Sequence, residues 1–198
     1  MDFFLTTERC GFSHWNKKDV SLATSLWGDP TVTKYICASG AFTAKEIENR
    51  LFTEIDNFEK YGVQYFPFYL LETKELIGCC GLRPYKNQND VYELGFHLRK
   101  KYWHKGYALE AAKAMIDYAF TELKAVELKA GHNPNNITSS KVLSKLGFQY
   151  EYDEYYEPTG LNHPLYRYPR FGSTPAQIQN PALHSPKRND KIAAKSKM

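Results

Sequence analysis

The spacing of apolar residues predicts that strands and helices follow one another along most of the chain. A period of two, typical of strands, marks residues of about 5–15, 64–72, 75–82, 91–98, 125–131, 148–156 and 165–170. A spacing of three and four, typical of helices, marks about 18–27, 43–61, 105–123 and 135–146. This order predicts an α/β fold with a mixed sheet flanked by about four helices.

Local signals mark the ends of the predicted helices. Thr43 and Glu46 have the spacing of a capping box and begin the second helix. The segment 28–30, Gly-Asp-Pro, stops the first helix, because proline does not continue a helix that precedes it. The second helix is expected to end at Gly62, and Gly147 supplies the left-handed residue that commonly follows the last turn of a helix.

The predicted strand 91–98 has two faces of different chemistry. One face holds Val91, Glu93, Gly95 and His97, and the other holds Tyr92, Leu94, Phe96 and Leu98. A carboxylate in the middle of a half-buried strand is costly unless it is used or paired. Glu93 therefore predicts either a functional group or a buried salt bridge.

The segment YWHKGYALEA, residues 102–111, leaves that strand and enters a helix at once. Gly106 and Ala108 keep side chains small there, which leaves consecutive N–H groups exposed at a helix N-terminus, and Lys105 adds a positive charge. Such a turn suits a pyrophosphate, although the residues alone fit an ordinary tight turn equally well. The patterns GxxxxGK[ST] and GxGxxG are absent from the sequence, which argues against a nucleoside triphosphate or dinucleotide site.

Length and composition indicate one globular domain. The chain has 198 residues, of which 42% are hydrophobic and 15% aromatic. Its sequence has no apolar run near the roughly 18 residues of a membrane span, and it begins without a basic region followed by an apolar one. We therefore expect a cytoplasmic protein with one domain over residues 1–172.

The positive charge is concentrated in the last residues. The segment 173–198 holds five Lys or Arg and one acidic residue, and it contains no aromatic side chain. Such a composition does not form a core, so we expect a flexible basic tail. The rest of the chain is close to neutral, and charge therefore does not favour a nucleic-acid partner except weakly through the tail.

Cysteines and histidines give no sign of a metal site. The four cysteines are Cys10, Cys37, Cys79 and Cys80, without a CxxC pair, and the six histidines are scattered. Adjacent residues of a strand point to opposite faces, so Cys79 and Cys80 are poorly placed to share one ion. We expect reduced thiols and no metal.

Two linked motifs resemble the GNAT acetyltransferase superfamily, and within it the RimJ/RimL-like branch. The first is ELGFHL followed by YWHKGYALEA, and the second is NPNNITSSKVLSKLGF about 25 residues later. Both occur in the order and at the spacing of that branch, and the predicted elements agree over residues 5–170. The resemblance implies a single GNAT-like domain with a mixed, mostly antiparallel central sheet that is splayed at the acetyl-CoA site.

The resemblance also implies acetyl-CoA as the acetyl donor. The backbone of Phe96, His97 and Leu98 would pair with the pantetheine arm as a guest strand. Asn136 and Lys141 would contact the pantetheine and the phosphates. The pyrophosphate would bind N–H groups of the turn residues His104, Lys105, Gly106, Tyr107 and Ala108, where this chain has His104 in place of the usual glycine.

Catalysis by such an enzyme requires a proton for the departing thiolate and a base for the amine. Many relatives supply the proton with a tyrosine where this chain has Leu143, and the RimJ/RimL-like branch has the serine that is Ser139 here. Ser139 is our candidate acid, although its hydroxyl could instead bind backbone near the helix start. Glu93 is our first candidate base, and the alternatives are Glu151, Glu154, Glu157 or water.

The acceptor remains open at this level. The resemblance favours a primary amine, with a protein α-amino group of ribosomal-protein type as the first expectation and a small amine or antibiotic as the alternative. Residues 31–62 and 150–168 should form the walls of the acceptor site. A second hypothesis is a non-catalytic CoA-binding module that docks through its basic tail. The sequence is compatible with a monomer or a homodimer.

Overall fold

The computed structural model describes residues 2–86 and 88–168, and these form one α/β unit. The predicted boundary at 172 and the predicted tail lie outside the described residues. In chain order the elements are β1 (Leu5–Thr6), β2 (Cys10–Phe12), α1 (Val20–Trp27), α2 (Pro30–Thr33), α3 (Ala44–Tyr61), β3 (Tyr65–Leu70), β4 (Leu76–Pro84), β5 (Val91–Leu98), the 3₁₀ turn η1 (Lys100–Tyr102), α4 (Tyr107–Thr121), β6 (Glu127–Gly131), α5 (Ile137–Leu146), β7 (Gln149–Tyr156) and β8 (Leu161–Tyr168).

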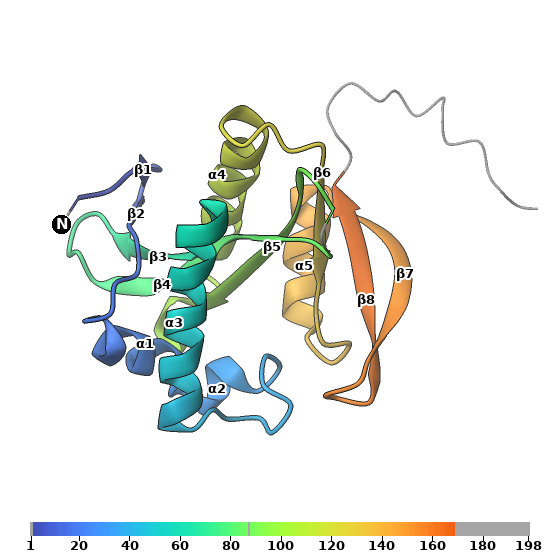
Figure 1. Ribbon diagram of the computed structural model, residues 1–198, viewed down its shortest axis with the longest axis horizontal. Helices are drawn as coiled ribbons and strands as arrows, with labels where there is room; N and C mark the ends of the chain where they lie inside the picture. The colour runs from blue at the N-terminus through green and yellow to red at the C-terminus, as the bar shows by residue number, and fades with distance from the viewer. Residues whose placement is uncertain (1, 87, 169–198) are drawn as a thin grey trace, which may run out of the picture.

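One eight-stranded sheet runs through the described part, in the order β1-β2-β3-β4-β5-β6-β8-β7. Every neighbouring pair is antiparallel except β5 and β6. The predicted mixed, mostly antiparallel sheet is confirmed. Figure 1 shows β1 and β2 at one end of the sheet and the β7–β8 hairpin at the other.

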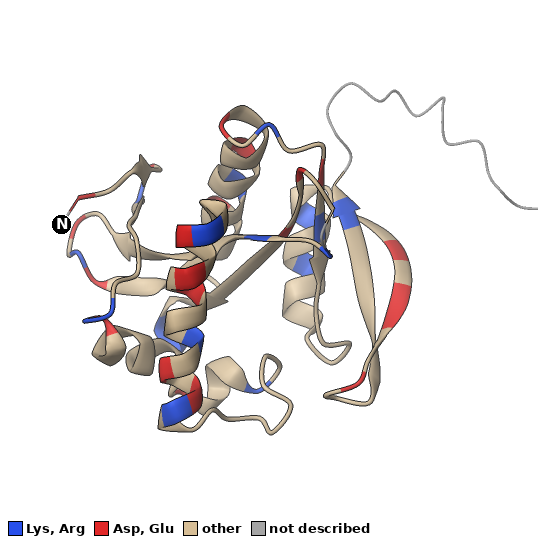
Figure 2. Ribbon diagram, in the orientation of Figure 1, with Lys and Arg blue, Asp and Glu red and all other residues tan. Residues whose placement is uncertain are grey.

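Helices cover both faces of the sheet and bury two separate apolar clusters. On one face, α1 and α3 pack with Tyr65, Tyr69 and Cys79. On the opposite face, α4 and α5 pack with residues that include Phe66, Phe68 and Cys80. The adjacent cysteines therefore point to opposite faces, as the strand period predicts. Figure 2 shows charges of both signs along α3 and over the edge strands, while most of the central sheet is free of them.

The sheet is splayed between β5 and β6. These strands pair in parallel only where Val91–Glu93 lies beside Glu127–Lys129. Beyond Glu93 the strands part, because β6 continues in pairing with β8 while β5 stays with β4. The residues Leu94–Leu98 therefore keep one strand edge that is not paired with β6, and the predicted splay is confirmed.

The N-terminal region differs from the single strand predicted over 5–15. Residues 7–10 form a turn in which Thr7 N donates to Cys10 O at 2.8 Å and Cys10 N donates to Thr7 Oγ1 at 3.0 Å. The turn is tied to α4, since Arg9 Nε donates to Glu110 Oε2 at 2.7 Å. The turn therefore separates the segment into two short strands, β1 and β2. The contact with Glu110 that holds this turn is distant in sequence, so the local pattern does not reveal it.

The helices differ from the prediction by one additional helix and by starts that lie about two residues later. The described part has five α-helices, because Asp29 caps an additional short helix, α2, by accepting from Thr31 N at 2.8 Å, with Pro30 in its first turn. The helix expected from about 105 begins at Tyr107, since Gly106 is left-handed. The Thr43–Glu46 capping box, the end of the second predicted helix at Gly62 and the left-handed Gly147 are confirmed. No helix of the described part is long and apolar enough to cross a membrane.

Candidate active site

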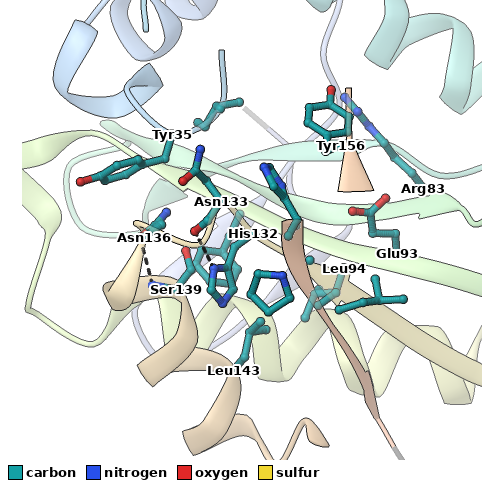
Figure 3. Close-up of a pocket in the computed structure, with 18 of the residues that line it drawn as sticks. Tyr35, Arg83, Glu93, Leu94, His132, Asn133, Asn136, Ser139, Leu143 and Tyr156 are labelled. Carbon is teal, nitrogen blue, oxygen red and sulfur yellow. Dashed lines mark hydrogen bonds between the residues drawn. The ribbon is translucent and has the colours of Figure 1, made fainter. Parts of the chain in front are cut away.

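A pocket of about 610 Å³ opens where β5 and β6 part. One wall consists of β5 residues Glu93–His97, and the facing wall consists of 130–133 at the end of β6 together with α5. Figure 3 shows Glu93 and Arg83 near Tyr156 in one region of the pocket, and Asn136 and Ser139 near Tyr35 in another. The two segments that were expected to wall an acceptor site also contribute: Tyr35, Ile36 and Arg50 from 31–62, and Glu154, Tyr155, Tyr156, His163, Pro164 and Leu165 from 150–168. The lining is completed by Tyr65, Arg83, Pro84, Tyr85 and Lys86.

The start of α5 places Ser139 in the pocket wall. Asn136 caps the helix, and its Oδ1 accepts from Ser139 N at 3.2 Å, as Figure 3 shows. This bond uses the backbone of Ser139 and leaves its side chain out. Within the described residues, Ser139 Oγ makes no hydrogen bond, so the hydroxyl of this half-buried residue is available to a bound molecule.

Glu93 lies in the opposite wall without an ion-pair partner among the described residues. Its antiparallel neighbour in register is Arg83, but the guanidinium of Arg83 pairs with the buried carboxylate of Glu54. Burial raises the pKa of Glu93, and the nearby charge of Arg83 opposes that rise. The structure therefore does not support the alternative that Glu93 serves in a buried salt bridge among the described residues.

His97 lies four residues after Glu93 on β5, and its environment disfavours the charged form of the imidazole. Burial lowers its pKa well below the ordinary value, and the charges of Arg50 and Arg83 add to that effect. Trp27 Nε1 donates to His97 Nδ1 at 3.2 Å, which assigns the ring proton to Nε2. The imidazole of His97 is therefore a weaker base than that of an ordinary histidine.

Gly95, between Glu93 and His97, makes room for an aromatic ring. A Cβ at this position would lie 2.3 Å from the ring of Tyr65, which crosses β5 there. The ring of Tyr65 in turn meets His97 edge-to-face at 5.7 Å. The glycine of the ELGF motif is thus required by the packing of Tyr65 against the strand.

The turn before α4 has the backbone expected of an anion site. The helical ladder begins with Glu110 N donating to Gly106 O at 3.0 Å, so the N–H groups of the first turn before it lie outside that ladder. Gly106 has φ 84° and His104 has φ 59°, both left-handed. The usual glycine at position 104 is explained by this φ, which His104 adopts at some cost. Arg9 Nη1 donates to Lys105 O at 3.1 Å and fixes the turn from outside.

The structure brings some of the predicted site residues together and leaves others elsewhere. Those that line the pocket are Glu93, Phe96, His97, Asn136 and Ser139. Those outside its lining are Leu98, His104, Lys105, Gly106, Tyr107, Ala108 and Lys141. Leu98 is buried at the end of β5, and Lys141 is exposed on α5.

The alternative acidic residues of the last strands are separated by the structure. Glu154 lines the pocket and forms an ion pair with Lys86. Glu151 pairs with Lys129 at 2.7 Å, outside the pocket lining. Glu157 is exposed and also lies outside that lining.

Sequence reasoning missed three charged residues around the pocket: Arg50, Glu54 and Arg83. Arg83 faces Glu93 only through the register of β4 and β5, and Glu54 reaches both Arg83 and Tyr65 N from α3. A weak signal was present, since Arg50 and Glu54 carry opposite charges four residues apart within an otherwise apolar stripe. Among the described residues, no group of three or more His, Cys, Asp or Glu could hold a metal ion.

The parted parallel strands, the capped helix beside them and the left-handed turn agree with the GNAT-like domain that the sequence resemblance implies. The model of the acetyltransferase (GNAT) domain matches residues 9–149, and the chain belongs to this family. A protein of Bacillus licheniformis named "Uncharacterized N-acetyltransferase p20" is 34% identical over 148 residues, which cover 74% of this chain and 83% of that protein. The chain is an acetyl-CoA-dependent N-acetyltransferase, and the alternative of a non-catalytic module is not supported.

Solved structures share the fold. A GNAT-family acetyltransferase from Bacillus anthracis has a TM-score of 0.72 at 28% identity and covers 84% of this chain and 98% of its own. RimL, described as a ribosomal L7/L12 α-N-protein acetyltransferase in complex with coenzyme A, has a TM-score of 0.71 at 11% identity, with 84% of this chain and 97% of that chain covered. At that identity the likeness to RimL concerns the fold alone.

Proposed function

We propose that the protein acetylates a primary amine, with Glu93 as the base for the amine and Ser139 as the acid for the leaving group. The observation that carries this proposal is their placement: both line one pocket at the splay, from facing walls, and neither has a side-chain partner among the described residues. An acceptor and the end of the donor would meet between them.

The chain offers acetyl-CoA two kinds of backbone site. The edge of β5 at Phe96, His97 and Leu98 is not paired with β6 and suits an extended amide-bearing arm. The turn 104–108 suits a pyrophosphate, because the N–H groups that precede Glu110 N lie outside the α4 ladder, at the end of the helix where the dipole favours negative charge. Asn136 and Lys141 on α5 would add polar contacts. When bound there, the donor supplies a thioester as the acetyl source.

Glu93 would hold the proton that the amine releases. The amine nitrogen must be neutral to form its bond to the acetyl carbon, and a carboxylate whose pKa is raised by burial takes up a proton more readily than an ordinary one. Glu154 lines the same pocket, but its pairing with Lys86 makes it a weaker candidate.

Ser139 would protonate the sulfur as the carbon–sulfur bond breaks. Ser139 lies on the wall that faces β5. The Asn136 cap holds its backbone and so fixes the position of the Cα that carries the hydroxyl group. One proton thus moves from amine to Glu93 and one from Ser139 to sulfur, while an amide bond replaces the thioester. The proton on Glu93 then returns through water to the Ser139 oxygen, which restores both side chains. Leu143, one turn further along α5, is buried and gives the pocket an apolar surface.

Two acceptor classes remain to be separated by experiment. The name of the RimL neighbour supports a protein α-amino group, which is also what the motif resemblance favours. A small amine is the other class. Purified protein would be incubated with acetyl-CoA and a panel of N-terminal peptides and small amines, and thiol release would be measured. Turnover that depends on an amine supports the proposal, whereas acetyl-CoA binding without turnover of any member would overturn it.

A further inference from the structure

The pocket wall contains two charged side chains of opposite sign that have no ion-pair partner among the described residues. Its charged lining residues among those described, histidines apart, are Arg50, Arg83, Lys86, Glu93 and Glu154. Arg83 is neutralised by Glu54, and Lys86 by Glu154. One cation, Arg50, and one anion, Glu93, are left without an ion-pair partner in the described part of the chain.

Arg50 lacks a partner for a specific structural reason. It precedes Glu54 by four residues on α3, a spacing at which arginine and glutamate commonly pair. However, both oxygens of Glu54 are in use: Oε1 pairs with Arg83, and Oε2 accepts from Tyr65 N at 2.9 Å. The carboxylate that would serve Arg50 is therefore committed to the sheet.

Aromatic rings hold the guanidinium of Arg50 in place, but its Nε has no hydrogen-bond acceptor among the described residues. It lies over the ring of Trp27, 5.1 Å from the centroid, and near the ring of Phe42 at 5.6 Å. Its Nε is buried and has no hydrogen-bond partner among the described residues. Burial lowers the pKa of Arg50, and the charge of Arg83 adds to this. A desolvated guanidinium favours a planar anion, and a carboxylate matches its fork.

Arg50 and Glu93 lie on the same side of the sheet. His97 shares the face of β5 that carries Glu93, and it contacts Trp27 and Tyr65, which belong to the apolar cluster of α1 and α3. The turn that precedes α4 leads into the helix on the opposite face. Arg50 is therefore placed for the acceptor and not for the phosphates of the donor.

We propose that the acceptor carries a carboxylate near its amine, and that Arg50 binds this carboxylate while Glu93 receives the amine. This inference rests on the proposed function and names the acceptor's chemistry. An ammonium and a carboxylate on one molecule complement the two unpaired charges of the wall. The carboxylate has two sources: the α-carboxylate of a free amino acid, or an acidic side chain next to the N-terminus of a peptide.

Matched acceptor pairs separate these sources. The first arm compares the free amino acids with their α-amides, and the second compares peptides that begin Ala-Asp or Ser-Asp with those that begin Ala-Asn or Ser-Asn. The value of kcat/KM would be measured from thiol release. We expect the carboxylate member of a pair to be favoured by roughly 10- to 100-fold in one arm, the range for a hydrogen bond to a charged group.

Variants assign the preference to Arg50. In Arg50→Met, which keeps the apolar stem over Trp27, the ratio between the two members should fall to about one. Arg50→Lys, which keeps the charge and loses the fork, should retain an intermediate ratio and serves if the first variant is unstable. Arg167→Met is the matched control, because Arg167 lies on β8 outside the pocket lining and should keep the wild-type ratio.

The outcomes distinguish this inference from the proposed function. Turnover of amines with equal kcat/KM for both members of every pair would overturn the carboxylate proposal and leave the acetyltransferase proposal intact. A preference that survives in both Arg50 variants would also overturn it. No amine-dependent turnover at all would overturn the proposed function and this inference with it.

Discussion

Glu54 and Arg83 form an ion pair at the wall of the pocket, with the Glu54 side chain fully buried and the Arg83 side chain 27% exposed. The pair links α3 to β4, and the guanidinium also lies 4.2 Å from the centroid of Tyr65. Removal of one partner leaves a buried charge without compensation, which is why such losses are severe.

Glu54→Gln should therefore destabilise the fold. The amide can still accept from Tyr65 N, but Arg83 loses its counter-charge, and we expect a loss near the lower end of about 3–5 kcal/mol because Arg83 is partly solvated. Chemical denaturation measures this free energy. The control is Glu48→Gln, which breaks the exposed Lys45–Glu48 pair and should change stability little. Equal effects of the two substitutions would contradict the assigned role of the buried pair.

Gly106→Val should abolish detectable CoA binding. The φ of 84° at Gly106 is unfavourable for a β-branched residue, so the turn that presents its N–H groups would be displaced. Calorimetry with CoA gives the readout. Gly160→Val imposes comparable strain, since Gly160 has φ 66°, but on the β7–β8 turn, and it should bind CoA as the wild type does. Unchanged affinity in Gly106→Val would exclude the turn as the pyrophosphate site.

Ser139→Ala should lower kcat by roughly 10²-fold, by analogy with the loss of one transition-state donor. Acetyl-CoA affinity should scarcely change, because the hydroxyl is needed only as charge develops on sulfur. Single-turnover kinetics with the best amine would measure the step. Ser140→Ala is the control, since the Ser140 hydroxyl lies 3.4 Å from Tyr166 OH and outside the pocket lining. A comparable loss in both variants would point to helix stability instead.

Glu93→Gln should lose activity in a pH-dependent manner. In the wild type the carboxylate must be ionised, so activity falls as pH drops through its raised pKa. In the variant the rate should recover at high pH, where the amine deprotonates without help. A pH–rate profile of both proteins distinguishes the cases. A uniform loss at every pH would make Glu93 structural and pass the base role to Glu154 or water.

The ionised carboxylate of Glu93 should lower the free energy of unfolding at neutral pH. A raised pKa in the folded state means that folding favours the protonated carboxyl, so stability falls as pH rises from the unfolded pKa, about 4.3, through the folded one. Glu93→Gln should therefore raise the thermal midpoint at pH 7, with the difference shrinking below about pH 4. A midpoint that is lower in the variant at pH 7 would contradict this sign.

Local sequence signals were sufficient for much of the fold. The capping box at Thr43, the left-handed Gly147 and the faces of β5 depend only on residues within a few positions, and they were predicted correctly. The β1–β2 hairpin was missed because its turn is held by Glu110, 101 residues from Arg9. Local periodicity carries no information on such a contact.

The site shows the same division. Ser139 and Asn136 were identified because the motif places them at a helix start, and Glu93 because a carboxylate interrupts a strand. Whether Glu93 is paired depends on Arg83, whose commitment to Glu54 follows from the packing of α3 on the sheet. The unpaired state of Arg50 depends on the same contact. Such properties arise from tertiary structure and have no counterpart in spacing.

The order of strands also makes the pocket depend on the final hairpin. The last strand of the described residues, β8, inserts between β6 and β7, and it contributes His163, Pro164 and Leu165 to the pocket. A chain cut before residue 161 would keep Arg50, Glu93 and Ser139, yet it would lack that wall and leave β6 without its antiparallel neighbour. The charged and hydroxyl groups of the site therefore precede, along the chain, the strand that closes the space between them.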